Sequence, residues 1–379
     1  MRVLVFASCS EGLALPLVPL GWALRTAGHE VLIACPENMA PALLGAGLPV
    51  YPYTPAIDIP DVLRHDRQGN PVQRPPLTDE LPMLAHIGRG YGRLAARFLP
   101  PALELARRWR PDMVVSEPQG LVGALVAAAL DVPWVKLGIS IGSLRMLEEV
   151  AFGEAAPELE QLGLSQFPEP AVFLDPCPES LQRADQPGTH RFRYLAYNGV
   201  AKYPDWALEE RTRPRLCLTI GTPLPVSGDL PLLVQLTRNL ADLDVELVIA
   251  VDEENAKPLY PLPEQVVVAG RVPLNLALPA CDLAVHHGGT GTTMACLTAG
   301  IPTVTFPAIA EVWDFARRLD AFGAAIRIKI EELSAERVLA ACTTILTDPS
   351  YRANAELLAK EVAALPTLTE SVDVLERLI

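Results

Sequence analysis

The sequence predicts an α/β protein of two doubly wound domains, each a parallel sheet with helices on both faces. First, short apolar runs of strand length alternate with helical segments in both halves of the chain, as in parallel sheets. Second, this pattern starts again near residue 216, after a stretch of turn-forming residues. Third, a chain of 379 residues, half of them hydrophobic, is too long for one ordinary core.

The first half opens with a βαβ pattern. Its first loop, Ser8-Cys9-Ser10-Glu11-Gly12, follows an apolar strand and should lie at the carboxyl edge of the sheet, where ligands of open α/β sheets bind. The helix after it should end at Gly28, a natural helix cap. The elements expected here are strands at 3–7, 31–34 and 48–51 and helices at 15–27 and 39–44.

Residues 53–81 differ from their surroundings, because they are rich in proline and charge and have no sustained period. A long irregular segment inside a compact domain is usually a functional loop. Regular structure should then return as helices at 86–108 and 121–130 and as strands at 113–117 and 134–137.

The second half repeats the alternation of strands and helices. Its expected strands are 216–220, 245–251, 266–269, 281–285 and 303–306, and three closing helices are expected near 334–346, 350–364 and 367–379. Turn residues between 186 and 213 place the linker there. We therefore expect an N-terminal domain at 1–195, a linker at 196–213, a C-terminal domain at 214–365 and a last helix at 366–379 that packs back on the N-terminal domain.

Composition excludes several classes of protein. A formal charge of −14 argues against non-specific nucleic-acid binding, which needs many Lys and Arg residues. The seven cysteines form no Cys-x-x-Cys pair, so reduced thiols in a cytoplasmic protein are expected. No apolar window is long enough to span a bilayer, so we expect no membrane partner.

The most informative stretch is a glycine-rich loop, His286-His287-Gly288-Gly289-Thr290-Gly291-Thr292-Thr293, between a predicted strand and a helix expected at 294–299. Such a turn brings backbone N–H groups and the positive end of the helix dipole against an anion. Glycines allow close approach, and threonine hydroxyls and imidazole rings add hydrogen bonds. The sequence therefore predicts a phosphate or diphosphate site.

This loop resembles the donor-binding segment of bacterial natural-product glycosyltransferases of the GT-B fold, above all actinobacterial ones that use dTDP-deoxysugars. The spinosyn rhamnosyltransferase is one of them. Further pieces that resemble the family run through the chain in the expected order: Ala27-Gly28-His29-Glu30-Val31, Asp175-Pro176-Cys177-Pro178, Tyr197-Asn198-Gly199, Gly300-Ile301-Pro302, Phe306-Pro307, Asp314-Phe315-Ala316-Arg317 and Phe322-Gly323-Ala324.

The resemblance implies two Rossmann-like domains facing each other across a cleft, with a nucleoside diphosphate sugar bound mainly by the C-terminal one. Val272 would lie against the base and Glu311 against the sugar, while Asp314 would contact the sugar or pair with Arg317 or Arg318. The implied donor residues are Gly221, Thr222, Val272, His286, Gly288, Gly289, Thr290, Gly291, Thr292, Glu311 and Asp314. No metal or other cofactor is expected, because helix dipoles stabilise the departing diphosphate.

The acceptor, an apolar polyketide-type molecule, is expected in the N-terminal domain, against the 53–81 segment. Candidate acceptor residues are Ser10, Leu13, His65, His86 and Leu137. Leu13 stands where relatives carry the histidine that deprotonates the acceptor, and Glu117 stands where they carry the acid that supports it. Leu137 likewise replaces a frequent histidine. Val312, in Glu311-Val312, lacks the polar contact of the relatives' Asp-Gln pair, which favours a deoxysugar.

Three explanations for the missing histidine remain open. Glu117 or Glu11 is the base, with a pKa raised by burial; or the acceptor is a phenol or an activated ring carbon that needs little help; or catalysis is lost.

The predicted activity is inverting transfer in antibiotic biosynthesis. The alternatives are a silent nucleotide-sugar-binding helper protein and a sugar-nucleotide 2-epimerase, and homodimerisation is left open.

Overall fold

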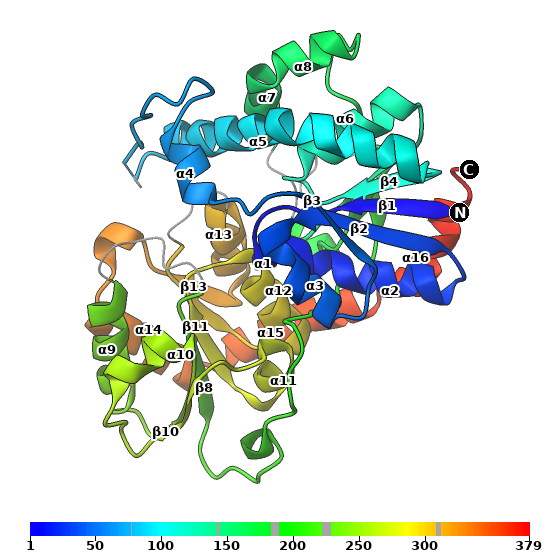
Figure 1. Ribbon diagram of the computed structural model, residues 1–379. Helices are drawn as coiled ribbons and strands as arrows, with labels where there is room; N and C mark the ends of the chain where they lie inside the picture. Colours follow the sequence, from blue (N-terminus) through cyan, green and yellow to red (C-terminus); the bar gives the residue numbers. More distant parts are fainter. Residues whose placement is uncertain (77, 142–144, 183–188, 222–228, 308–311) are drawn as a thin grey trace. The chain divides into compact units, whose positions relative to one another are not determined.

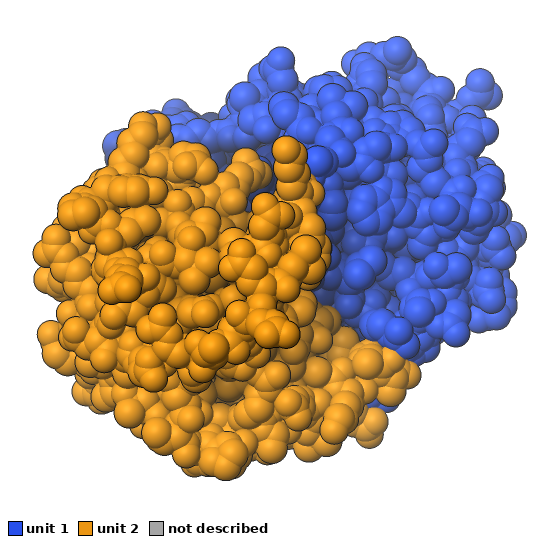
Figure 2. Space-filling model, turned by 90° about the horizontal axis from the view of Figure 1, so that it is seen from below, with its two compact units in different colours: residues 1–177, 182–200, 365–379 blue, residues 178–181, 201–364 orange. Residues whose placement is uncertain are grey.

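The structure is a computed structural model that describes residues 1–379 except 77, 142–144, 183–188, 222–228 and 308–311. The chain forms two compact units, which Figure 2 shows in two colours. Unit 1 comprises Met1–Cys177, Gln182–Val200 and Leu365–Ile379, and unit 2 comprises Pro178–Leu181 and Ala201–Ala364. Each unit is built on its own parallel sheet with helices, which confirms the predicted fold class.

Unit 1 contains a seven-stranded parallel sheet among the described residues, in the order β3-β2-β1-β4-β5-β6-β7. Its strands are β1 (Arg2–Phe6), β2 (Glu30–Pro36), β3 (Val50–Thr54), β4 (Met113–Ser116), β5 (Trp134–Leu137), β6 (Val172–Asp175) and β7 (Thr189–Arg191). Its helices are α1 (Glu11–Ala14), η1 (Leu15–Leu17), α2 (Val18–Thr26), η2 (Glu37–Met39), α3 (Ala40–Gly45), α4 (Ile59–Arg64), α5 (Glu80–Trp109), α6 (Leu121–Leu130), α7 (Arg145–Glu154), α8 (Ala156–Gln161) and α16 (Leu368–Glu376).

Strand β1 shows why this sheet is buried on both faces. Successive side chains of a strand point to opposite faces, so Val3 and Val5 pack with α2, α3 and α16 while Leu4 and Phe6 pack with α5 and α6. Figure 1 shows these two groups of helices on opposite sides of the sheet. The continuous apolar run in the sequence is therefore one strand between two cores.

Several element boundaries predicted for unit 1 were wrong. The single helix expected at 15–27 is two elements, η1 and α2, and α1 precedes them. Pro16 and Pro19 each lie at the start of one of these two elements, because proline lacks the N–H that a helix interior needs. The irregular 53–81 segment contains α4, and the stretch around the linker contains β7, which pairs with β6. Helices α7 and α8 and strand β6 had not been predicted, because 138–185 carries no clear period.

Unit 2 contains a six-stranded parallel sheet among its described residues, in the order β10-β9-β8-β11-β12-β13. Its strands are β8 (Arg215–Thr219), β9 (Glu246–Ala250), β10 (Val266–Gly270), β11 (Leu283–His286), β12 (Thr303–Thr305) and β13 (Ala325–Arg327). Its helices are η3 (Glu179–Leu181), η4 (Asp205–Ala207), α9 (Asp229–Leu240), α10 (Glu253–Ala256), η5 (Lys257–Leu259), α11 (Leu274–Ala277), η6 (Leu278–Ala280), α12 (Thr290–Ala299), α13 (Trp313–Phe322), η8 (Ile330–Glu332), α14 (Ala335–Thr347) and α15 (Pro349–Ala363).

The C-terminal segment belongs to unit 1, although the residues just before it belong to unit 2. Thr367 caps α16 in a reciprocal capping box with Glu370. Leu368, Val372 and Leu375 of α16 are buried in the unit 1 core that also contains α2. No helix in the described ranges combines the length and apolarity needed to cross a membrane.

Candidate functional site

In unit 2 the order of the strands places two loops side by side at the carboxyl edge of the sheet. Strands β8 and β11 are neighbours, but the chain leaves β8 toward β9 on one side and leaves β11 toward β12 on the other. Open α/β sheets bind ligands at such a switch point. Gly221 follows β8 here, and His287, Gly288 and Gly289 follow β11.

Helix α12 begins at Thr290, four residues earlier than predicted, so Thr290, Gly291 and Thr292 form its first turn rather than a preceding loop. Gly289 is the N-cap residue, and it provides no side-chain hydrogen bond. The first turn carries no acidic residue. The unpaired N–H groups and the positive end of the helix dipole can therefore receive an anion.

The His286 ring is fully buried, and its Nδ1 accepts a hydrogen bond from the backbone N–H of Gly288 at 3.1 Å. Its Nε2 has no hydrogen-bond partner among the described residues. Burial lowers the pKa of His286 to about 3, so the ring is neutral at physiological pH. In this position the ring shapes the turn after β11; its predicted contact with the diphosphate stays a prediction.

His287, part of the glycine-rich loop but not one of the implied donor residues, lies against both loops. Its ring occupies the space that a Cβ atom would need at Gly221 and also at Gly289. Burial lowers the pKa of His287 to about 4, and its Nδ1 has no partner in the described part of the chain. The two glycines leave room for a neutral imidazole beside the first turn of α12. The spacing of glycines around His287 was a signal that sequence reasoning missed.

The remaining donor candidates of unit 2 lie in different environments. Val272 is half-buried between β10 and α11. Asp314, in the first turn of α13, pairs with Arg318 at 2.5 Å and with Arg317 at 3.5 Å, as in the ion-pair alternative. Gly288 has a φ of +82°, which favours glycine. Thr222 and Glu311 lie outside the described residues.

In unit 1 the switch point lies between β1 and β4. Glu117 follows β4, and its carboxyl group is fully buried. Its Oε1 accepts a short hydrogen bond from the Ser8 hydroxyl, in the loop after β1, and its Oε2 accepts one from the backbone N–H of Gln119 at 2.6 Å. Burial raises the pKa of Glu117 to about 7, although these hydrogen bonds oppose the shift.

A small pocket lies beside Glu117. Tyr53 packs edge-on against Phe6 and Phe98 in its wall, with ring centroids 5.5 and 5.7 Å away. The Oε1 atom of Gln119 has no partner among the described residues. The pocket is lined by Phe6, Ala7, Ser8, Cys9, Tyr53, Leu94, Ala95, Phe98, Gln119, Gly120, Leu121 and Val122. It is therefore a mostly apolar recess with a few polar groups.

The other candidates for catalysis or acceptor binding are dispersed in unit 1. Ser10 is the N-cap residue of α1, and Glu11 and Leu13 are half-buried on that helix. His65 pairs with Asp61 at 3.1 Å.

Two acceptor candidates are buried. Leu137 is 1% exposed and belongs to the core cluster beneath the sheet, because its side chain points to the face covered by α2. His86 is buried on α5, where burial lowers its pKa. The predicted contact of these two residues with an acceptor stays a prediction.

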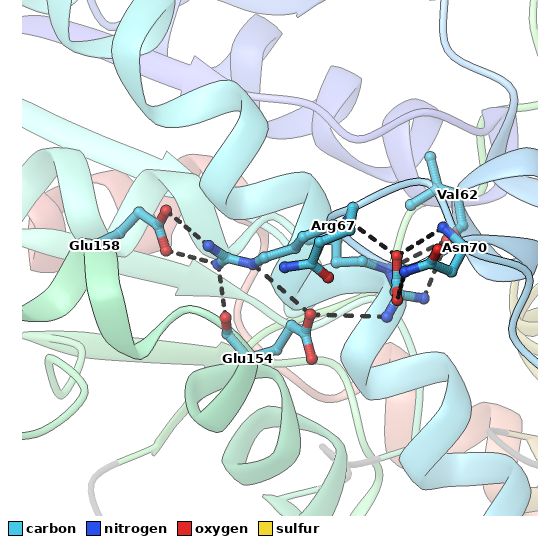
Figure 3. Close-up of polar contacts among 8 residues, drawn as sticks. Val62, Arg67, Asn70, Glu154 and Glu158 are labelled. Carbon is cyan, nitrogen blue, oxygen red and sulfur yellow. Dashed lines mark hydrogen bonds and ion pairs between the residues drawn. The ribbon is translucent and has the colours of Figure 1, made fainter.

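Hydrogen bonds and ion pairs hold part of the 53–81 segment, which is expected to line the acceptor site, against the rest of unit 1 (Figure 3). Arg67 donates to both carboxylate oxygens of Glu158 on α8, at 3.0 and 2.7 Å, and to the backbone carbonyl of Glu154 at 2.6 Å. The Arg93 guanidinium on α5 donates to the backbone carbonyl of Val62 at 3.0 Å. Residues 62–67 are therefore held against α5, α7 and α8.

Metal ligands are not clustered in the ranges that the structure describes: no group of three or more His, Cys, Asp or Glu side chains there could hold a metal ion.

Known proteins resemble this chain over its whole length. Residues 22–221 match the N-terminal domain, and residues 234–378 the C-terminal domain, of a family described as erythromycin biosynthesis protein CIII-like. The chain is 38% identical over 370 residues to the L-demethylnoviosyl transferase of Streptomyces niveus, which covers 97% of this chain and 95% of that protein.

Two solved structures are also similar. The glycosyltransferase SsfS6 of Streptomyces sp. SF2575, complexed with thymidine diphosphate, is 48% identical with a TM-score of 0.90, covering 100% of this chain and 99% of that one. The spinosyn rhamnosyltransferase SpnG, complexed with spinosyn aglycone, is 31% identical with a TM-score of 0.86, covering 99% and 100%. These findings confirm the resemblance that the sequence motifs indicated.

Proposed function

The chain belongs to the EryCIII-like family and is a glycosyltransferase, and from this premise we propose that it moves a deoxysugar from dTDP to an apolar, polyketide-type acceptor with inversion. The observation that carries the proposal is the glycine-rich turn into α12 at the switch point of unit 2. Backbone N–H groups and the hydroxyls of Thr290 and Thr292 would bind the diphosphate there.

The choice of dTDP as the nucleotide is supported by the relatives. SsfS6 and SpnG are both described in complex with thymidine diphosphate. In this chain the two histidines of the turn are neutral, so the diphosphate charge would be met by N–H dipoles and hydroxyls rather than by cations.

A deoxysugar fits the apolar residue that follows Glu311. Val312 is buried, and its Cγ2 would stand 3.5 Å from a Cβ atom at Gly288. A valine leaves no polar group unpaired if the sugar lacks a hydroxyl at that position. Two relatives are described as a desosaminyl transferase and a 2-deoxy-L-fucose transferase, which handle sugars of this class.

For the acceptor we propose that its reacting hydroxyl enters the small, mostly apolar pocket of unit 1, whose polar groups include Ser8 and Gln119. A carboxylate with a pKa of about 7 suits general base catalysis near neutral pH, so Glu117 would be the final proton acceptor in place of the base missing at Leu13. Glu11 is the weaker candidate, because it is half-exposed on α1 and its side chain has no hydrogen bond or ion pair among the described residues.

The proposed reaction is a direct displacement. The acceptor oxygen, or a nucleophilic ring carbon, forms its bond to the anomeric carbon as the bond to the diphosphate breaks, which inverts that carbon. The developing charge on the diphosphate would be stabilised by the first turn of α12, so we propose that no metal is required.

Calorimetric titration with dTDP and UDP tests the donor site. We expect dTDP to bind more tightly than UDP, and Thr290→Ala and Thr292→Ala each to weaken dTDP binding about fivefold, the value of one hydrogen bond of roughly 1 kcal/mol. Thr298→Ala is the matched control, because its hydroxyl bonds to the Met294 carbonyl at 2.7 Å within the same helix. Equal dTDP affinity in all four proteins would remove the proposed diphosphate site.

A transfer assay separates the proposed activity from its alternatives. dTDP-sugars are offered with phenolic polyketides, with and without EDTA, and products are identified by mass spectrometry and NMR. A β-product from an α-donor, formed equally in EDTA, is expected. Donor binding without transfer would favour a helper protein, and isomerised donor without transfer would favour an epimerase.

A further inference from the structure

Glu117 has no direct access to an acceptor. Its side chain is 0% exposed, and it does not line the pocket of unit 1. One carboxylate oxygen is occupied by the Ser8 hydroxyl and the other by the backbone N–H of Gln119. A proton that reaches this carboxylate from the pocket must therefore pass through a neighbouring group.

Ser8 is the group that lies between the pocket and Glu117. Ser8 lines the pocket and is 6% exposed, and its hydroxyl donates its only proton to Glu117. A hydroxyl that donates one hydrogen bond still has two lone pairs with which to accept another. A hydroxyl in the pocket could therefore donate to Ser8 while Ser8 donates to Glu117.

We propose that Ser8 is a proton relay between the acceptor hydroxyl and Glu117, replacing the histidine that is absent at Leu13. The inference rests on the proposed function. As the acceptor oxygen bonds to the anomeric carbon, its proton passes to the Ser8 oxygen, and the original Ser8 proton passes to Glu117. The diphosphate leaves with the electron pair of the broken bond. Glu117 later returns the proton to solvent.

The groups around Glu117 leave it as the proton acceptor of this cluster. The Cys9 thiol, in the loop after β1, has a pKa raised to about 12, mainly by burial. Tyr53, on β3, also has a raised pKa, mainly by burial and further through Cys9, Cys35 and Glu117. These two neighbours are therefore neutral near pH 7, and of the three groups only the carboxyl group of Glu117 changes its charge there.

Gln119 gives the acceptor a second point of attachment in the same pocket. Its Oε1 is buried without a partner among the described residues, which is costly unless a ligand or water donates to it. A second hydroxyl of the acceptor would satisfy that oxygen. Such a contact would orient the first hydroxyl toward Ser8.

The pH profile of transfer tests the relay with three variants. Ser8→Ala removes the hydroxyl, and we expect kcat to fall about 100-fold or more at every pH. Ser8→Thr keeps a hydroxyl and should restore kcat to within roughly tenfold of the parent. Ser371→Ala is the control: it removes another buried hydroxyl of unit 1, on α16, that does not line the pocket, and it should leave kcat and the fall of kcat at low pH (the acidic limb) unchanged.

The profile also distinguishes a relay from a residue that only adjusts the pKa of Glu117. The Ser8 hydrogen bond lowers that pKa, so Ser8→Ala must move the acidic limb to higher pH in either case. If Ser8 only adjusted the pKa, kcat of Ser8→Ala would regain the parent value at high pH. That recovery would overturn the relay.

Infrared spectroscopy tests the Ser8–Glu117 contact without any substrate. The protonated-carboxyl band that Glu117→Gln removes is titrated in the parent and in Ser8→Ala. We expect a higher midpoint in Ser8→Ala, and an unchanged midpoint would overturn the inference. Loss of transfer in the parent would instead count against the proposed function, so the two failures are separable.

Discussion

At the scale of single residues, the chemistry of Glu117 follows from its burial. A carboxyl group in this loop would ordinarily be ionised at neutral pH, but desolvation raises its pKa to about 7. The family resemblance identified Glu117, at the end of a predicted strand, as the position of the supporting acid, and the sequence analysis allowed that burial would raise its pKa. It gave no indication of Ser8 as the partner, because the two residues are 109 positions apart and meet only where β1 and β4 pair.

The same burial makes stability depend on pH. The pKa of Glu117 is about 7 in the folded protein against a usual value of 4.5, so folding favours the protonated carboxyl group. This preference adds to the free energy of unfolding in full below about pH 4.5, and the addition is lost as pH rises through 7. Between pH 5 and 8 this loss should be about 2 to 3 kcal/mol. Glu117→Gln cannot ionise, so its free energy of unfolding should fall less over that range. Urea unfolding at both pH values checks this; parallel pH dependence in the two proteins would contradict it.

At the scale of elements, two glycines at the start of α12 differ in what surrounds them: Gly289 precedes the helix and Gly291 lies in its first turn. Gly289 has φ −54° and ψ 140°, which any residue can adopt, so the need for glycine comes from the His287 ring beside it. Gly291, two residues on, has nothing within 4 Å of an added Cβ atom. Sequence reasoning treated both glycines alike, because it could not see the ring.

A pair of alanine substitutions checks this difference. Gly289→Ala must displace His287, so it should lower the free energy of unfolding by about 1 to 3 kcal/mol. Gly291→Ala adds a methyl group to an open position in a helix, where it should be neutral or stabilising by roughly 0.5 to 1 kcal/mol. Urea unfolding of both proteins is the measurement. A Gly289→Ala protein as stable as the parent would show that His287 is not confined between the loops.

At the scale of the whole molecule, the chain returns to unit 1 after completing unit 2. Residues 365–379 add α16 to the core beneath the first sheet, 165 positions after the preceding part of unit 1 ends at Val200. Helical periodicity and the polar cap at Thr367 indicate a helix there, the one that we expected from the sequence to pack back on the N-terminal domain. Its buried side chains make unit 1 dependent on the end of the chain.

Truncating one buried leucine tests that dependence. Leu375 is 0% exposed, so Leu375→Ala should lower the free energy of unfolding of unit 1 by about 2 to 5 kcal/mol. Leu44, on α3 of the same unit, is 57% exposed, and Leu44→Ala should change it by less than about 0.5 kcal/mol. Urea unfolding followed by circular dichroism compares the two variants. Similar effects would mean that α16 does not stabilise unit 1.

The sequence by itself determined the parallel α/β class, the glycine-rich turn and the family, because apolar periodicity, glycine spacing and motif order are local properties of the chain. Only the tertiary structure decided that α12 begins at Thr290, that Leu137 is core, that His287 lies between two glycines and that Ser8 donates to Glu117. These facts depend on strand order and burial. Residues far apart in sequence become neighbours only when the sheet assembles, and their pKa values change only when that assembly removes water.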